Sequence, residues 1–246
     1  MFVFTKAISS ASKTCETGRQ EQVLVSIFAI GDIHGCSLAL EMLLSVIPLQ
    51  EDDTLVTLGD YEDRGPDTPG VFERLLRLEQ EYHLVALRGN HDEMMLNAQT
   101  NRDAQGAWEI NGGTSTLDSY GSMSAVPNAH WQFLEHHCVD FWECETHFFV
   151  HGSAYPTVPL WEQPVGKLHW GSFNDVQPHE SGKVMVCGHT SQKNGRPADK
   201  GYAVCLDTYV YGSGWLSCLD VGQGMVWQTN QRQQMRWFAL TASVES

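Results

Sequence analysis

Aspartate, asparagine and histidine residues recur directly after predicted strands, in a pattern that suits metal-ion chemistry. The segment 59–65, Gly-Asp-Tyr-Glu-Asp-Arg-Gly, follows the apolar run 54–58. A strand that ends in Gly-Asp places a carboxylate at the carboxyl edge of a sheet, which is where open α/β sheets bind ligands. Related segments stand upstream at 31–35, Gly-Asp-Ile-His-Gly, and downstream at 89–92, Gly-Asn-His-Asp.

Two strands predicted in the second half of the chain also end in a histidine, and each histidine lies beside a glycine. Five strand ends therefore carry Asp, Asn or His next to a residue that allows a tight turn. Turn chemistry is the simplest explanation for any one of them, but it explains the whole set poorly. The side chains that these five ends present are Asp32, His34, Asp60, Asn90, His91, His151 and His189.

Oxygen and imidazole ligands without thiolates suit Mn²⁺, Fe or Zn²⁺. The set is too large for one ion and sufficient for two, and Asp60, from the middle motif, is the natural bridging carboxylate. Two divalent ions roughly 3.5–4 Å apart would acidify a water and direct it at a phosphorus atom. They would also make a positive site in a chain of formal charge −15. Arg64 and Arg88 would add planar guanidinium groups that suit phosphate. We expect two divalent ions, Mn²⁺ first, with Fe or Zn²⁺ as alternatives.

The composition limits the partners of the chain. Its 246 residues are 42% hydrophobic and 18% charged, as in an ordinary globular protein. The negative charge argues against nucleic acid as a partner. Seven cysteines, an odd number without a Cys-x-x-Cys pair, favour a reducing, cytoplasmic location. No apolar run approaches the roughly 18 residues of a membrane span, so no membrane partner is expected. The sequence leaves the oligomeric state open.

Strands and helices alternate in the first half of the chain, which predicts βαβ units and a parallel sheet. The predicted strands are 23–30, 54–58 and 83–87, followed by helices that begin near Ser37, Thr68 and Asp92. Short helices are predicted at 107–111, 114–120 and 127–136, with a break at Gly112-Gly113.

The second half is predicted to be rich in strands, at 141–145, 147–150, 184–187, 202–206, 215–220 and 225–229. Glycine-rich turns at 212–214 and 222–224 are hairpin signals. Residues 153–180 read as loop, with a short element at 167–170. We expect a flexible extension over 1–22 and a single domain over 23–246, built from two packed sheets with outer helices.

The order of these motifs resembles the phosphoprotein phosphatase family of calcineurin-like metallophosphoesterases, especially its compact bacterial serine/threonine phosphatases. The family motifs are G-D-x-H-G, G-D-x-x-D-R-G, G-N-H-[ED], H-[AG] and G-H-T, and they stand here at 31–35, 59–65, 89–92, 151–152 and 188–190. The resemblance runs from about Val23 to about Trp227. It implies an α/β fold with a central β-sandwich of two mixed sheets flanked by helices.

The resemblance also implies roles for individual residues. His91 would donate a proton to the leaving oxygen, with Asp63 as its orienting carboxylate, and such general-acid help is worth roughly 10²–10⁴ in rate. Arg64 and Arg88 would bind the phosphate oxygens. The implied metal ligands are Asp32 and His34 for one ion, Asp60 as the bridge, and Asn90, His151 and His189 for the other.

Three positions depart from the family pattern. Glu62 stands where the family usually has Val or Ile, and we expect it to be solvated. Ser172 occupies a position where many bacterial relatives carry an arginine, so one phosphate-binding side chain is missing or replaced. Tyr209 replaces a usual glycine. It could pack in the core, which we favour, or it could line the mouth of the site and meet an aromatic or base leaving group.

The leading hypothesis is a metal-dependent phosphomonoester hydrolase that acts on phosphoserine or phosphothreonine in proteins, or on small phosphate esters. The alternative is symmetrical dinucleoside tetraphosphate hydrolysis. Those relatives commonly lack counterparts of Asp63 and Arg88, so the phosphatase is preferred. A nuclease is disfavoured because Ser191 stands in place of the second histidine of G-H-x-H. A metal-binding regulatory module without turnover is disfavoured by the intact His91 and Asp63.

Overall fold

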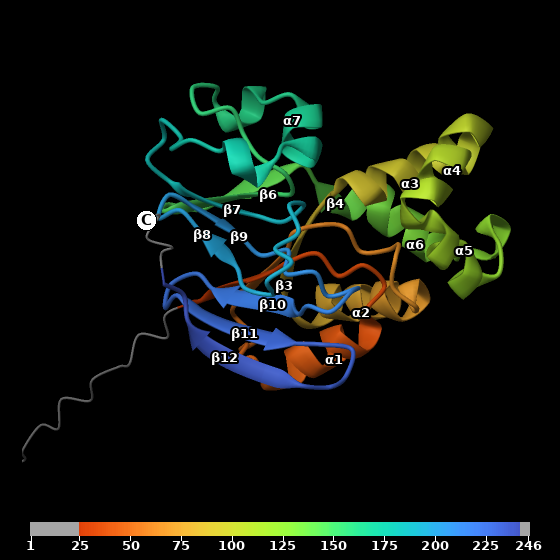
Figure 1. The fold of residues 1–246 in the computed structure, drawn as a ribbon, viewed down its shortest axis with the longest axis horizontal. Coiled ribbons are helices and arrows are strands. Elements are labelled where there is room, and N and C mark those ends of the chain that lie inside the picture. The colour runs from red at the N-terminus through yellow and green to blue at the C-terminus, as the bar shows by residue number, and fades with distance from the viewer. Residues whose placement is uncertain (1–24, 242–246) are drawn as a thin grey trace, which may run out of the picture.

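Two β-sheets packed face to face form the centre of the computed structural model, which describes residues 25–241 (Figure 1). The larger sheet has seven strands in the order β12-β11-β10-β1-β2-β3-β4. Its strands are β1 (Ile27–Ile30), β2 (Thr54–Thr57), β3 (His83–Leu87), β4 (Cys138–Val139), β10 (Leu216–Asp220), β11 (Met225–Thr229) and β12 (Met235–Ala239).

The smaller sheet has five strands in the order β5-β6-β7-β9-β8. Its strands are β5 (Phe141–Glu143), β6 (His147–Val150), β7 (Val184–Cys187), β8 (Ala198–Asp199) and β9 (Ala203–Cys205). Strands β1 to β4 run parallel to one another, as do β6, β7 and β9, whereas β10, β11 and β12 in the larger sheet and β5 and β8 in the smaller sheet pair antiparallel. Both sheets are therefore mixed, and each has a parallel centre with its carboxyl ends at one edge.

Apolar side chains fill three layers. The layer between the sheets joins residues of both, and its largest members are Phe149 and the leucines Leu58, Leu87, Leu206 and Leu219. A second layer lies between the seven-stranded sheet and helices, and a third covers the outer face of the five-stranded sheet. Because both faces of the central strands are buried, these strands are apolar without strict alternation.

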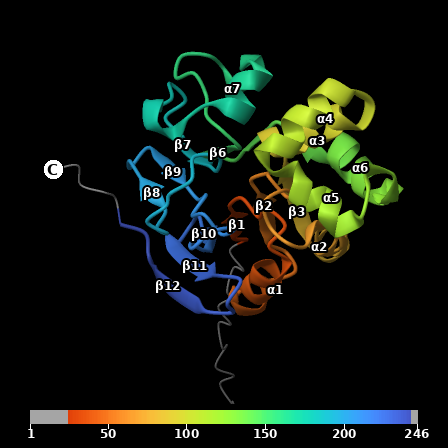
Figure 2. The same ribbon diagram turned by 45° about the vertical axis from the view of Figure 1, so that its right-hand side comes forward.

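Helices cover the outer faces. In Figures 1 and 2, α1 and α2 lie against the larger sheet, α7 lies over the smaller one, and α3 to α6 gather at one end. The α-helices are α1 (Ser37–Val46), α2 (Thr68–Glu81), α3 (Asn90–Thr100), α4 (Arg102–Trp108), α5 (Thr114–Tyr120), α6 (Asn128–Gln132) and α7 (Val165–Trp170). Short 3₁₀ and π turns are η1 (Glu109–Gly113), η2 (Met123–Ala125), η3 (Phe133–His137), η4 (Leu160–Glu162) and η5 (Phe173–Asp175).

Local sequence explains where α2 begins and which face it buries. Asp67 caps the helix by accepting a hydrogen bond from the Gly70 amide, and Pro69 sits in the first turn, where its missing N–H is harmless. The buried residues Val71, Leu75 and Leu78 follow the three-to-four-residue period of one helix face.

Most of the predicted elements are present, with shifted ends. The strand predicted at 23–30 begins only at Ile27, and the turn at 222–224 joins β10 to β11 as a hairpin. The hairpin expected at 212–214 is wrong, because β9 and β10 belong to different sheets. The short or edge strands β4, β8 and β12 were not expected. The predicted extension, 1–22, lies outside the described residues.

The six cysteines in the described part of the chain are all free, and five of them are buried. Buried thiols of this kind pack as small apolar groups. No helix between residues 25 and 241 is both long and apolar enough to cross a bilayer.

Candidate metal centre

The carboxyl ends of strands from both sheets bring the predicted ligands together. Two groups of buried side chains have ligand atoms that all lie within 4.8 Å of one another, and Asp60 belongs to both. The groups are His34, Asp60 and His91, and Asp32, Asp60 and His151. A shared carboxylate suits a bridging ligand, although Asp32 groups here with His151 and not with His34, the partner predicted for it.

Asp60 directs its two carboxylate oxygens to opposite sides. Its Oδ2 lies 3.5 Å from His34 Nε2, and its Oδ1 lies 3.3 Å from His151 Nε2. Oδ1 also accepts a hydrogen bond from the His91 amide at 3.0 Å. Asp60 therefore links β2 to the strand ends of β1, β3 and β6.

Asn90 joins the two histidines contributed by the smaller sheet. Its Oδ1 lies 3.0 Å from His151 Nε2 and 2.8 Å from His189 Nδ1. The backbone amide of His189 donates to both carboxylate oxygens of Asp32, at 3.0 and 3.2 Å. The side chains of Asn90, His151 and His189, from three separate segments, thus lie close together beside Asp60.

Burial and neighbouring charges shift the pKa values of the two carboxylates, Asp32 and Asp60, in opposite directions. Burial, reinforced by the charges of Asp207 and Asp60, raises the pKa of Asp32 well above its usual range. Burial alone would also raise the pKa of Asp60, but His151, His91 and His34 hold it well below. Two buried carboxylates this close together favour a bound cation, because a cation would stabilise both charged forms.

His34 and His189 present neutral nitrogens to the same space, whereas Asp60 outweighs burial at His151 and raises its pKa. Burial lowers the pKa of His34 well below its usual value, and burial together with His151 lowers that of His189 to about 4. His34 Nδ1 lies 2.8 Å from the Glu62 carbonyl, and His151 Nδ1 lies 2.7 Å from the Leu58 carbonyl. A proton on Nδ1 would satisfy each carbonyl and leave Nε2 with a free lone pair toward the cluster.

This donor set fits divalent metal ions. It combines carboxylate and amide oxygens with imidazole nitrogens, contains no thiolate, and includes Asp32, whose buried charge a cation would stabilise. The outer nitrogens of two histidines contact backbone carbonyls, as is typical of metal-ligating histidines.

A second buried arrangement holds His91 in a defined orientation. Its Nδ1 lies 2.6 Å from Asp63 Oδ2, which also accepts from Trp108 Nε1 at 2.8 Å. The other oxygen, Oδ1, accepts from Thr116 Oγ1 at 2.7 Å. Burial raises the pKa of Asp63, and the bonds from His91, Thr116 and Trp108 oppose that rise. His91 Nε2 is left facing Arg64 and the cluster.

Arg64 lies across the face of the cluster. Its Nη1 is 2.9 Å from His34 Nε2, its Nη2 is 2.8 Å from His91 Nε2, and its guanidinium carbon lies 4.7 Å from the ring centroid of Tyr211. Arg64 is therefore the nearest side-chain cation to the predicted ligands. An anion that reaches the cluster would meet it.

Arg88 lies apart from Arg64 and from the cluster of predicted ligands. Its Nη2 donates to the carbonyl of Leu134 at 2.7 Å, and its Nη1 lies 3.9 Å from Asp140. Asp140 also contacts the buried His169, which in turn contacts Glu93. In this arrangement Arg88 joins η3 and the β4–β5 turn to β3.

Backbone strain is concentrated at the site. Seven non-glycine residues in the described chain have positive φ, and five of them are His34, Asp60, Asp63, Arg64 and His189. Such conformations are costly and persist where the surroundings enforce them, often at functional sites. Two glycines are required by close contacts: a Cβ at position 89 would lie 2.1 Å from Asp60 Oδ1, and one at position 188 would lie 2.0 Å from Asp32 Oδ1.

Asp92 was overlooked in the sequence. Its carboxylate accepts from the amides of Asp60, Tyr61 and Gly89, at 2.9, 3.1 and 2.6 Å. It thereby supports the tight turn that presents Asp60. Its place at the start of a helix, directly after Asn-His, was the available signal, because carboxylates there accept amide hydrogen bonds.

The expectation for Glu62 is wrong. Its side chain is fully buried, and neither carboxylate oxygen has a hydrogen-bond partner among the described residues. Positive φ at Asp60 and Asp63 turns the chain on both sides of it, so the side chain points inward. Burial and the charges of Asp92 and Asp63 raise its pKa well above the usual range, which favours the neutral acid.

The two other departures are also resolved. Ser172 accepts a hydrogen bond from the Asn174 amide and caps η5, so it brings no charge to the position of the missing arginine. Tyr209 is only half-buried, and the preferred core packing is wrong. Its ring centroid lies 4.7 Å from that of Tyr211, the residue beneath Arg64.

Comparisons of the sequence with known proteins identify one family and several relatives. A family model described as calcineurin-like phosphoesterase matches residues 25–212. Serine/threonine-protein phosphatase 1 of Salmonella typhimurium is 39% identical over 147 residues, which cover 56% of this chain and 64% of that protein. The symmetrical bis(5'-nucleosyl)-tetraphosphatase of Paracidovorax citrulli is 40% identical over 75 residues, which cover 30% of this chain and 26% of that protein. The chain thus spans less than two thirds of the length of these curated relatives.

Solved structures share the architecture at low sequence identity. A crystal structure provisionally named a diadenosine tetraphosphatase is 20% identical, with a TM-score of 0.63, and the match covers 90% of this chain and 96% of that one. The cold-active protein-tyrosine phosphatase of a Shewanella species is 16% identical, with a TM-score of 0.60, over 87% of this chain and 80% of that one. At these identities the likeness describes the fold alone.

Proposed function

The chain belongs to the calcineurin-like phosphoesterase family, and from that premise we propose that it hydrolyses phosphomonoesters, with phosphoserine and phosphothreonine as its main substrates. The expected family and the expected fold, two mixed sheets flanked by helices, are confirmed. The observation that carries the proposal is the position of Asp60, which is shared by two groups of potential metal ligands.

We assign two divalent metal ions to this site, with Mn²⁺ as the first expectation and Fe or Zn²⁺ as alternatives. When bound, the ions supply an acidified water and positive charge for the phosphate. The ligands that would hold them are Asp32 and His34 on one side, Asp60 between, and Asn90, His151 and His189 on the other. The convergence of Asn90 Oδ1 with His151 Nε2 and His189 Nδ1 supports the second set.

In the proposed reaction, the oxygen of water bonds to phosphorus while the bond from phosphorus to the leaving oxygen breaks. His91 donates the proton that the leaving oxygen requires. Asp63 supports this role because its Oδ2 lies 2.6 Å from His91 Nδ1 and orients the ring with Nε2 toward the cluster. Arg64, beside His91 Nε2, would bind the phosphate oxygens.

A phosphate contact by Arg88 requires a rearrangement. Its guanidinium would have to leave the Leu134 carbonyl and Asp140 to reach the cluster. We therefore assign phosphate binding first to Arg64, and keep Arg88 as a second phosphate ligand that substrate must draw inward.

Symmetrical dinucleoside tetraphosphate hydrolysis is the second candidate. One ground for preferring the phosphatase was an arginine at position 88, and its position away from the cluster weakens that ground. The other reason was the presence of Asp63, which lies beside His91 and still favours the phosphatase. The similarity to bis(5'-nucleosyl)-tetraphosphatases keeps this activity as the main competitor.

Turnover of a substrate panel by the Mn²⁺-loaded protein tests the proposal. The panel contains phosphoserine and phosphothreonine peptides, p-nitrophenyl phosphate, nucleotides and diadenosine tetraphosphate. We expect the highest kcat/KM with the phosphopeptides. Much faster hydrolysis of diadenosine tetraphosphate would reverse the ranking, and absence of turnover with every substrate would reject both candidates.

A further inference from the structure

The loop that follows β9 carries two tyrosines that extend outward from the metal centre. The Tyr211 ring meets the His34 ring edge-on, with centroids 4.8 Å apart, and lies beneath Arg64. The Tyr209 ring lies next, 4.7 Å from that of Tyr211, and Lys193 Nζ lies 5.9 Å from the Tyr209 centroid. We call Arg64, Tyr211, Tyr209 and Lys193 the tyrosine row.

The loop holds the outer tyrosine in a defined place. Tyr209 has a φ of 65°, a left-handed conformation that an aromatic residue rarely adopts. Asp207 accepts hydrogen bonds from the Tyr209 amide at 3.0 Å and from Ser191 Oγ. The Tyr209 carbonyl accepts from the amide of Gly214 at 3.0 Å. Strain that the surroundings enforce is typical of segments that clamp a ligand.

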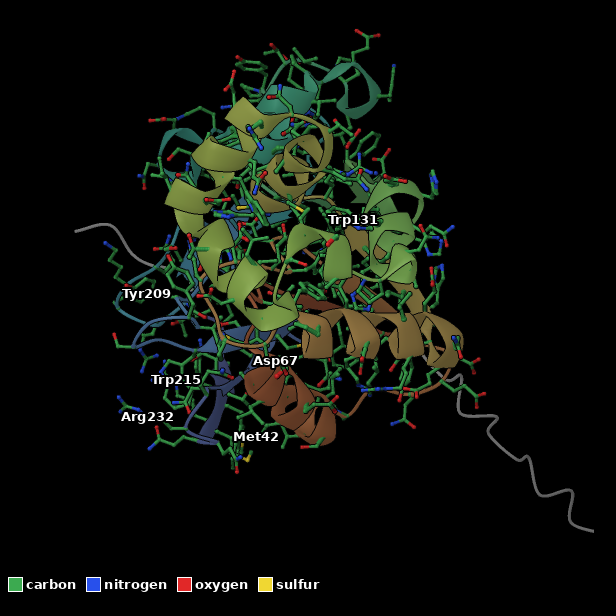
Figure 3. All side chains as sticks on the ribbon, turned by 90° about the vertical axis from the view of Figure 1, so that its right-hand side faces the viewer. Met42, Asp67, Trp131, Tyr209, Trp215 and Arg232 are labelled. Carbon is green, nitrogen blue, oxygen red and sulfur yellow. The ribbon has the colours of Figure 1, made fainter. Side chains whose placement is uncertain are left out.

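Gly212 fits against the outer ring. A Cβ at position 212 would lie 2.1 Å from Tyr209 Cε1, so the glycine allows the loop to close onto one face of the ring. Both tyrosines remain half-buried. Figure 3 shows Tyr209 at the outer edge of the molecule, above Trp215.

The charges at the two ends of the row have the same sign. Lys193 is exposed and has no ion pair with any residue between 25 and 241. In a chain of formal charge −15, Lys193 adds positive charge next to an aromatic surface, where it would attract an anionic group. Arg64 contacts His34 and His91 at the inner end of the row, and a substrate whose phosphate bound there would bring a second negative group toward Lys193.

We infer that the tyrosine row is the leaving-group subsite of this enzyme, and that it binds an aromatic ring carrying further negative charge, as a nucleotide does. The inference rests on the proposed phosphoester hydrolysis and adds aromatic phosphate esters to the phosphopeptides as a second substrate class. Aromatic rings bind planar groups through stacking, which tolerates different ring types. A phosphoserine side chain offers no ring, so the row would distinguish the two candidate substrate classes.

Steady-state kinetics with substrates of matched chemistry tests this inference. The Mn²⁺-loaded protein is assayed with glycerol phosphate, p-nitrophenyl phosphate and diadenosine tetraphosphate, which carry no ring, a ring alone, and rings with further charge. Tyr209→Asn removes the ring with a residue that tolerates left-handed backbone. We expect the ratio of kcat/KM for ring substrates to that for glycerol phosphate to fall about tenfold, through KM.

Lys193→Gln tests the recognition of negative charge separately from the recognition of the aromatic ring. We expect it to raise KM for diadenosine tetraphosphate about threefold, and to reduce the salt dependence of that KM, because an exposed cation is screened by salt. The ratio between p-nitrophenyl phosphate and glycerol phosphate should stay as in the wild type. Since Lys193 is exposed, this variant remains informative even if Tyr209→Asn fails to fold.

Tyr155 provides a matched control. It is 47% exposed, and Lys167 Nζ lies 5.0 Å from its ring centroid, so it reproduces the Tyr–Lys pair outside the metal centre. Tyr155→Asn should leave every ratio unchanged. The inference is overturned if Tyr209→Asn affects ring and alkyl substrates equally, or if Tyr155→Asn has the same effect. In either case the wild-type enzyme still hydrolyses phosphoesters, so the proposed function survives; a wild type that hydrolyses no substrate overturns both.

Discussion

The two sheets contribute to the metal centre in different ways. The seven-stranded sheet supplies the carboxylates, His91 as the proposed proton donor, and Arg64. Its own residues hold them: Asp92 supports the turn at Asp60, and Asp63 orients His91. The five-stranded sheet supplies His151 and His189, and acceptors from the larger sheet orient both. His151 Nδ1 contacts the Leu58 carbonyl, and the His189 amide donates to Asp32.

This difference indicates that the larger sheet builds the site and the smaller one completes it. A change in the larger sheet should disturb ligands on both sides of Asp60. A change in a histidine of the smaller sheet should disturb one side only. Variants at Asp60 and His189 separate these two cases.

Asp60→Asn should lower kcat/KM by at least about a thousandfold, because several kcal/mol of charge stabilisation depends on the shared ligand. Metal content, measured by elemental analysis after dialysis, should fall on both sides of the site. His189→Asn serves as the comparison and should retain more metal per chain. Equal metal content in the two variants would contradict the asymmetry, and retained turnover in Asp60→Asn would remove its bridging role.

His91→Asn should keep the metal content of the wild type and lower kcat by at least about a hundredfold, because a general acid is lost. The loss should be smallest for leaving groups that need little protonation, such as p-nitrophenolate. A series of aryl phosphates of increasing leaving-group pKa provides the measurement. A loss that is the same for every leaving group would argue against proton donation.

Asp92→Asn should weaken metal binding about tenfold to a hundredfold, the usual effect of changing a group that supports a ligand. Both carboxylate oxygens of Asp92 accept hydrogen bonds from the backbone N–H groups of Asp60, Tyr61 and Gly89. An asparagine side chain has only one acceptor oxygen, so it cannot accept hydrogen bonds at both positions. Calorimetric titration with Mn²⁺ measures the effect. Wild-type affinity in this variant would mean that the larger sheet does not depend on Asp92 to present Asp60.

The smallest effect concerns the pH dependence of stability. Burial and His151 lower the pKa of His189 from 6.5 to about 4. Between these values the unfolded chain binds a proton that the folded chain does not. The folded state therefore loses stability as pH falls from 6.5 toward 4.

His189→Gln isolates this contribution from those of other groups. With metal chelated, the unfolding free energy of the wild type minus that of the variant should rise from pH 4 to pH 6.5, by on the order of 2 kcal/mol. Urea denaturation at several pH values measures the difference. A difference that does not change with pH would show that His189 titrates normally.

The sequence predicted the central part of the fold well. Strands β1 to β3 are short apolar runs, each followed by a motif and a helix with clear start signals, and these features are local. Strands β4 and β8 have two residues each, and β12 lies at an edge with alternating exposure. Such strands depend on pairing with distant partners, so local patterns do not reveal them.

The sequence predicted the residues of the candidate site, but not the contacts that hold them in position. Glycines next to Asp60 and His189 marked the tight turns, and the motifs indicated the candidate ligands. Glu62 was misjudged because a carboxylate is normally solvated, whereas its burial follows from backbone turns on either side. The contacts of Arg88 with η3 could not be foreseen, because they join segments 46 residues apart.

Anomalous diffraction from crystals grown with Mn²⁺ would locate the ions that Asp60 is proposed to bridge. We expect two manganese peaks roughly 3.5–4 Å apart, one on each side of the Asp60 carboxylate. The first should contact Asp32 and His34, and the second Asn90, His151 and His189. Asp60 without a manganese neighbour, or peaks distant from these side chains, would contradict the account.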